Sequence, residues 1–238
     1  MANDPDGFMA ELTPTAARPL LGVTVLVVED SRYACEALRL ICLRSGARIR
    51  RADCLRSARR HLQSYRPMAV IVDLGLPDGS GLDLIAEIAA RRPRVPALVA
   101  TSGDGTAEAR ALAAGADAFL PKPLESVRAF QSTILAALPH RAAPGWREAA
   151  PEDRVSPDPL ALRDDFSHVA ELLSGGAGET LDYVAQFLSG IALSTRDDAL
   201  WDAAEALTRE RGCGGDGSAP VARISGLVQA RLTEAEAF

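Results

Sequence analysis

Acidic and hydroxyl side chains stand at the ends of successive apolar runs in the first half of this sequence. Glu29 and Asp30 follow the run VTVLVV, Asp73 follows AVIV, and Thr101 follows PALVA. Lys122, the only lysine among 26 basic residues, follows the run AFL. If the runs are parallel strands, their carboxyl ends meet at one edge of a sheet, where open α/β sheets bind ligands. We therefore expect these five side chains to form one site.

Such a site would suit a cation and a phosphoryl group together. Three carboxylates in one crevice repel each other unless a cation joins them, and Mg²⁺ prefers hard oxygen ligands of this kind. A dianionic phosphoryl group on one carboxylate would complete the coordination of the metal. Solvated charges at strand ends would explain any one of these residues but not the whole set.

The elements that would position these residues alternate between residues 23 and 139. Apolar runs occur at 23–28, 69–72, 96–100 and 118–120, with a weaker one at 47–52, and helical patterns lie between them near 31–45, 54–65, 81–91, 105–114 and 124–138. This alternation is typical of a parallel α/β sheet. Three of the runs are continuously apolar, so we expect central strands that helices cover on both faces.

The second half has a different organisation. Residues 140–157 mix proline, glycine and charge without apolar periodicity, which indicates a linker. Apolar residues then recur at helical spacing in four stretches, and Asp158 and Pro159 suit an N-cap and a first helical position. We predict an N-terminal extension at 1–20, an α/β domain at 21–139, the linker, and a smaller all-α helical bundle at 158–235.

Charge is divided unevenly between the two halves. Residues 20–140 carry 16 basic and 12 acidic side chains, whereas residues 156–238 carry 6 basic and 14 acidic ones. Phosphate backbones would repel such an acidic second half, so we expect no nucleic-acid partner. No apolar run reaches roughly 18 residues, and the start MANDPDGFMAELTP carries acids where a secretory signal needs a basic patch. We expect a cytoplasmic protein without membrane insertion.

Four motifs in residues 22–139 resemble a known family. VLVVEDS, IVDLGLPDGSGLDLI, ALVATSG and GADAFLPKPL are similar, in order and spacing, to the signatures of the CheY-like receiver domain of bacterial response regulators. The resemblance implies a five-stranded parallel sheet in the order 2-1-3-4-5. It also implies two-component signalling, in which a histidine kinase or a phosphotransfer protein gives a phosphoryl group to one aspartate. The C-terminal helices resemble no family in this way.

The resemblance assigns the acidic residues to acceptor and metal roles. Asp73 would be the phosphoacceptor, with its carboxylate as the nucleophile. Asp30, with Glu29 behind it, would hold Mg²⁺, and the backbone carbonyl of Gly75 would add a ligand.

The resemblance assigns three further residues to binding the phosphoryl group and responding to it. Thr101 would bond a phosphoryl oxygen through its hydroxyl, and Phe119 would change rotamer when it does. Lys122 would place its ammonium against the phosphoryl group. The resemblance also implies a cis peptide bond before Pro123.

Two glycines depart from the usual pattern. Gly75 and Gly103 lie two residues beyond Asp73 and Thr101, where the family often carries larger side chains that obstruct water. We therefore expect a poorly shielded acyl phosphate.

A magnesium-dependent phosphohydrolase of the haloacid-dehalogenase kind is a rival interpretation. That family needs a second acid two residues after the first, but Leu74 and Gly75 follow Asp73 here. We expect no enzyme beyond the autophosphorylation and autodephosphorylation of a phosphoacceptor.

The C-terminal bundle carries no GGDEF-like run and no basic recognition helix. We expect it to bind a protein partner. Tyr183 and Phe187 lie outside the main apolar stripe of their helix, which favours a homodimer through the bundle, helped by Trp201.

The alternative is a second phosphorelay station on His168. The segment DDFSHVAELLSG faintly resembles a kinase histidine box, and His168 would face solvent on its helix. However, Asp164, Asp165 and Glu171 would surround the imidazole with negative charge and repel an incoming phosphoryl group.

Overall fold

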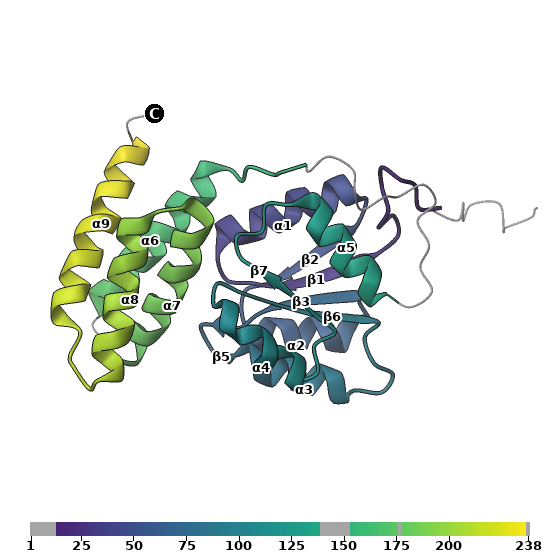
Figure 1. Cartoon of the computed structure of the whole chain (residues 1–238), viewed down its shortest axis with the longest axis horizontal. Helices are drawn as coiled ribbons and strands as arrows, with labels where there is room; N and C mark the ends of the chain where they lie inside the picture. Colours follow the sequence, from purple (N-terminus) through teal and green to yellow (C-terminus); the bar gives the residue numbers. More distant parts are fainter. Residues whose placement is uncertain (1–12, 139–152, 176–177, 237–238) are drawn as a thin grey trace, which may run out of the picture.

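The computed structural model describes residues 13–138, 153–175 and 178–236, which form two units side by side. One unit is a parallel sheet between two layers of helices, and the other is a bundle of helices beside one end of that sheet (Figure 1).

The sheet has five parallel strands in the order β2-β1-β3-β6-β7, which confirms the predicted order 2-1-3-4-5. Every residue of β3 and β6 is buried, because helices cover both faces of the sheet. The strand bounds are β1 Thr24–Val28, β2 Arg48–Ala52, β3 Ala69–Asp73, β6 Ala97–Ser102 and β7 Ala118–Pro121.

The helices of this unit form two layers, each with its own core. Helices α1 (Arg32–Ser45) and α5 (Val127–Ala137) pack on one face, above the sheet in Figure 1. Helices α2 (Leu55–Ser64), α3 (Gly81–Ala90) and α4 (Glu108–Ala113) pack on the other. The helix predicted near 105–114 starts as a 3₁₀ turn at Gly105–Ala107 before α4 begins.

A short hairpin after β3 is absent from the predicted elements. It joins β4 (Gly75–Leu76) to β5 (Gly79–Ser80) and leads directly into α3. The chain folds back closely here, because a Cβ atom on Gly81 would lie 2.0 Å from the carbonyl oxygen of Asp73. Glycine at position 81 therefore lets α3 start beneath the end of β3.

Four helices form the second unit, as predicted. They are α6 (Pro159–Gly175), α7 (Gly178–Thr195), α8 (Asp198–Gly212) and α9 (Ser218–Glu236). Their apolar stripes meet in one core, with Val169, Leu188, Leu207 and Ile224 fully buried. No helix in the described part of the chain is long and apolar enough to span a membrane.

The α/β unit extends beyond its predicted edges. Residues 140–152 of the predicted linker, residue 139 of the predicted α/β domain, and residues 1–12 lie outside the described residues. Val155, within the predicted linker, is buried in the core beneath α1 and α5, and its N–H donates to the carbonyl of Glu125 at 2.9 Å. Leu20, in the predicted N-terminal extension, is fully buried in the same core.

Candidate functional site

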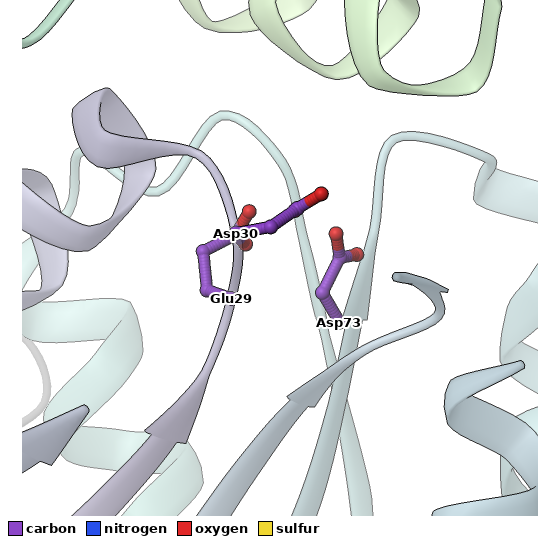
Figure 2. Close-up of side chains that lie close together, drawn as sticks. All are labelled: Glu29, Asp30 and Asp73. Carbon is purple, nitrogen blue, oxygen red and sulfur yellow. The ribbon is translucent and has the colours of Figure 1, made fainter. Parts of the chain in front are cut away.

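The predicted acidic residues meet at the carboxyl edge of the sheet. Glu29 and Asp30 directly follow β1, and Asp73 ends the neighbouring strand β3. Each carboxylate offers an oxygen atom, and these oxygens all lie within 4.8 Å of one another. Figure 2 shows the three side chains converging at the strand ends. Glu29 and Asp73 are buried, and Asp30 is half-buried.

Lys122 provides the cation predicted for this edge. Its Nζ lies 2.8 Å from Glu29 Oε2 and 3.1 Å from Asp73 Oδ2, and its side chain is 6% exposed. The Lys122–Pro123 peptide bond is cis, as the family resemblance implies.

Burial and crowding shift the pKa values of these groups. Burial, reinforced by the charge of Asp73, raises the pKa of Asp30 to about 7 and raises that of Glu29 well above its ordinary value. Burial alone would lower the pKa of Lys122, but the carboxylates of Asp73 and Glu29 raise it above its usual value. Lys122 is therefore charged. Its single positive charge does not offset the repulsion among the three carboxylates when all of them are ionised.

Two observations fit the implied metal ion and phosphoryl group. The clustered oxygens are hard ligands, and a divalent cation would relieve the repulsion that raises the two carboxyl pKa values. Thr101 lies beside Asp73 in the β3–β6 register, and its Oγ1 is buried without a hydrogen-bond partner among the described residues. A buried hydroxyl without a partner is costly, and a phosphoryl oxygen would satisfy it.

The two remaining predicted receiver residues flank these groups. Gly75, whose carbonyl is an expected metal ligand, borders the same cavity as Asp73. Phe119 lies on β7 opposite Ala100, and its partly buried ring packs on the core that contains α3 and α4.

Helix α7 lies directly over this site, and sequence reasoning missed it. The Tyr183 hydroxyl donates a hydrogen bond to Asp30 Oδ2 at 2.5 Å. Burial, and then the charge of Asp30, raises the pKa of Tyr183. A Cβ atom on Gly190 would lie 3.7 Å from Lys122 Nζ, so the backbone of α7 passes close to the ammonium. In Figure 2 green helical ribbon of the bundle lies above the carboxylates.

Side chains of α7 also fill the space above the two unusual glycines. A Cβ atom on Gly75 would lie 2.5 Å from Gln186 Cδ and Nε2, and one on Gly103 would lie 2.7 Å from Leu193 Cδ1. The space above these two glycines is therefore filled by α7 in the described structure, and the expected poor shielding of the acyl phosphate stays a prediction. The bulk that these two positions lack is supplied by Gln186 and Leu193 of α7, far along the chain from both glycines.

Helix α6 contributes a second contact through Asp165. Its carboxylate accepts hydrogen bonds from Ser31 Oγ at 2.7 Å, Arg32 N at 2.8 Å and Tyr33 N at 3.1 Å. It therefore caps the start of α1, directly after the acidic pair, with a buried side chain. Burial raises the pKa of Asp165, although these hydrogen bonds oppose the shift.

His168 is exposed on α6, as predicted, and its ring meets that of Phe187 edge-on at 5.9 Å. Asp164 and Glu171 are exposed on the same helix, but Asp165 turns toward α1. Glu29 and Asp30, but not Asp73, border the cavity beside His168. Among the described residues, His168 does not line the cavity that contains Asp73.

The apolar side chains that suggested a homodimer are used within one chain. Phe187 is buried in the bundle core, Tyr183 reaches the acidic pair, and Trp201 borders the cavity that contains Asp73. These side chains therefore have contacts within one chain, without a second copy of it.

Comparisons with known proteins agree with the geometry of the first unit. Residues 25–133 match the family model of the response regulator receiver domain. The chain is 32% identical over 172 residues to the response regulator protein PilR of Pseudomonas aeruginosa, covering 68% of this chain and 38% of PilR. It is 35% identical over 114 residues to the virulence transcriptional regulatory protein PhoP of Salmonella typhimurium, covering 47% of this chain and 51% of PhoP.

Among solved structures, the receiver domain of NtrX from Brucella abortus is 28% identical, with a TM-score of 0.45, over 49% of this chain and 98% of that one. This chain thus spans between about a third and a half of the length of the two curated relatives above.

Proposed function

Because residues 25–133 are a response regulator receiver domain, a module of two-component signalling, we propose that Asp73 accepts a phosphoryl group from a sensor histidine kinase or a phosphotransfer protein. The observation that carries this proposal is the cluster at the sheet edge. One oxygen from each of three carboxylates lies within 4.8 Å of the others, beside the buried ammonium of Lys122 and the Thr101 hydroxyl, which has no hydrogen-bond partner among the described residues.

In this proposal, each side chain of the cluster has its own role. A carboxylate oxygen of Asp73 attacks phosphorus while the P–N bond of the donor histidine breaks. Lys122 pairs with one equatorial phosphoryl oxygen, and the Thr101 hydroxyl donates a hydrogen bond to another. Glu29, Asp30, Asp73 and the carbonyl of Gly75 would hold Mg²⁺, which would neutralise further charge on the transferring group.

Phosphorylation then acts as a switch. When Thr101 moves toward the phosphoryl group, Phe119 changes its rotamer, and the surface of α4 and α5 changes with it. The shift is a change in the balance of existing conformations, because a ligand can move an equilibrium only by its differential affinity. Outside the gain and loss of this phosphoryl group, we propose no catalytic activity.

The output, in this proposal, is a protein contact through the C-terminal helices and not DNA binding. The segment 156–238 carries 6 basic and 14 acidic side chains, a balance that phosphate backbones repel. PhoP is named a transcriptional regulatory protein, so an electrophoretic shift assay with duplex DNA is the direct test. A shift of the DNA band at physiological salt would contradict the proposal.

A homodimer through the C-terminal helices also stays a prediction. Light scattering at tens of micromolar, with and without phosphorylation, tests it. A monomer in both states would contradict it.

The acceptor role is tested by treating the full chain with phosphoramidate and Mg²⁺ and measuring the intact mass. We expect one phosphoryl group on the wild type and none on Asp73→Asn. Asp83→Asn, which alters an exposed carboxylate on α3, is the matched control and should be labelled normally. Equal labelling of the Asp73 variant and the control would overturn the proposal.

A further inference from the structure

We propose that Gln186 of α7 positions the water that hydrolyses phosphorylated Asp73, so that the C-terminal bundle dephosphorylates its own receiver. This inference rests on the proposed phosphorylation of Asp73. It assigns the bundle a chemical task at the site that it covers.

The position of Gln186 is the first support. Its amide lies against the backbone of Gly75, two residues after the phosphoacceptor, at a point where a Cβ atom would collide with it. The absence of a side chain at Gly75 is what lets this amide in. Gln186 and Asp73 both border one cavity of about 550 Å³ between α7 and the receiver. A water molecule occupies about 30 Å³ of liquid volume, so this cavity has room for a phosphoryl group and water together.

The hydrogen-bonding capacity of Gln186 is the second support. Its side-chain amide has no hydrogen-bond partner among the described residues. Gln186 is an exposed residue, and it lines the cavity. A primary amide offers two donors and one acceptor. It can therefore accept a hydrogen bond from a water molecule while it donates one to a phosphoryl oxygen. Glutamine performs this task in GTPases, where it orients the attacking water.

Two other polar α7 side chains border the cavity, and both have partners within the bundle: Asp182 pairs with Arg211 at 2.9 Å, and the Ser189 hydroxyl donates to the Ala185 carbonyl at 2.9 Å. Leu193, above Gly103, is apolar, and Gly190 has no side chain. The Tyr183 hydroxyl already donates to Asp30. Gln186 is therefore the α7 group in contact with the receiver that remains available to hold water.

The step itself is a hydrolysis. The oxygen of the water attacks phosphorus opposite the Asp73 oxygen, and the bond between phosphorus and that oxygen breaks. Asp73 leaves as a carboxylate, and inorganic phosphate leaves with both protons of the water. No oxidant, reductant or further reactant is required.

The test measures the decay of the phosphorylated full chain. Phosphoramidate and Mg²⁺ load the protein, desalting removes the donor, and intact mass follows the loss of the phosphoryl group. Gln186→Met keeps the length and packing above Gly75 but removes the amide. We expect it to slow decay roughly a hundredfold, the effect of losing one well-placed hydrogen-bonding group. The control Gln229→Met, on the exposed side of α9, should decay like the wild type.

The direction of the change separates this role from simple shielding. If Gln186 only kept water out, its removal would speed decay. Gln186→Asn, which retains a shorter amide, should decay faster than Gln186→Met. Decay of Gln186→Met at or above the wild-type rate, or equal rates for the Asn and Met variants, would overturn the inference. If the wild type takes up no label, the proposed acceptor role fails instead.

Discussion

At the scale of single residues, the surroundings of Lys122 explain why this position carries a lysine in a chain whose other Lys and Arg positions are all arginine. Its ammonium pairs with Glu29 and Asp73 inside a nearly closed site, and the backbone of α7 at Gly190 comes close to it. A compact ammonium is a point charge that fits this space, whereas a planar guanidinium is larger and binds through a wide fork.

We therefore expect Lys122→Arg to keep the fold and Mg²⁺ binding but to lose the phosphorylation-dependent change on α4 and α5. The guanidinium cannot reach the same position against the phosphoryl group. Hydrogen exchange of residues 108–113 and 127–137, with and without phosphoramidate, measures this change. Arg60→Lys, an exchange on the exposed part of α2, is the control. A normal switch in Lys122→Arg would contradict the prediction.

At the scale of elements, the turn after β3 packs closely against the end of the strand that carries Asp73. Gly81 starts α3 so close to the end of β3 that a Cβ atom would lie 2.0 Å from the Asp73 carbonyl oxygen. That atom belongs to the backbone and cannot rotate away. The position of Asp73 therefore depends on a glycine that takes no part in the chemistry.

Gly81→Ala should lower the free energy of unfolding by about 1–3 kcal/mol, the usual cost of overpacking, and should slow labelling of Asp73. Gly226→Ala is the matched control, because a Cβ atom there would meet nothing within 4 Å. In the interior of α9 this change should be neutral or stabilising by up to about 1 kcal/mol. Urea unfolding measures both. Equal effects of the two substitutions would show that the close approach carries no cost.

The start of α8 depends on one carboxylate. Asp197 accepts a hydrogen bond from Leu200 N at 3.1 Å and from Arg231 Nε of α9 at 2.9 Å. Burial alone would raise the pKa of Asp197, but the bond from Arg231 and the cap hold it below its ordinary 3.8. Because the folded chain favours the ionised form, this stabilisation is present above pH 3.8 and is lost as the pH falls through the lower pKa of the folded state.

Asp197→Ala should lower the free energy of unfolding by about 1–2 kcal/mol near neutral pH. The difference from the wild type should shrink as the pH falls below about 4. Asp202→Ala, an exposed position on α8, is the control and should change stability by less than about 0.5 kcal/mol. If the difference in unfolding free energy between Asp197→Ala and the wild type stays constant down to the lowest pH, the ionised carboxylate of Asp197 is not the source of the stabilisation.

At the scale of the whole molecule, the bundle closes over the receiver site through a small set of polar contacts. Tyr183 binds Asp30, Asp165 caps α1, and Arg196 pairs with Glu125 at 2.9 Å. The first of these contacts involves Asp30, one of the proposed metal ligands. We therefore expect a donor protein that reaches Asp73 to compete with the docked bundle for this face.

Asp165→Ala should loosen this contact, because three hydrogen bonds to the start of α1 are lost together. We expect faster hydrogen exchange at residues 32–34 and a larger radius of gyration in small-angle scattering. The neighbouring Asp164→Ala is the matched control. Its ion pair with Arg32 joins side chains that are 51% and 66% exposed, and such pairs contribute little. Identical behaviour of the two variants would contradict the proposed docking role of Asp165.

Much of the receiver was predictable because its information is local. Continuous apolar runs marked the buried strands, and the residues after Val28 and Val72 had to meet once those strands lay parallel. The small hairpin after β3 was missed, because two-residue strands leave no periodic pattern. The edges at Leu20 and Val155 were missed because runs of one or two apolar residues carry no periodicity either.

The sequence by itself determined the sheet, its order, the four C-terminal helices and the identity of the clustered site residues. The tertiary structure alone decided that α7 covers that site and that Tyr183, Gln186 and Asp165 belong to it. Helical periodicity predicts which face of a helix is apolar, but it does not predict which surface that helix meets. Polar side chains on the remaining face have the same pattern whether they contact water or a neighbouring domain, so only the packed chain distinguishes the two.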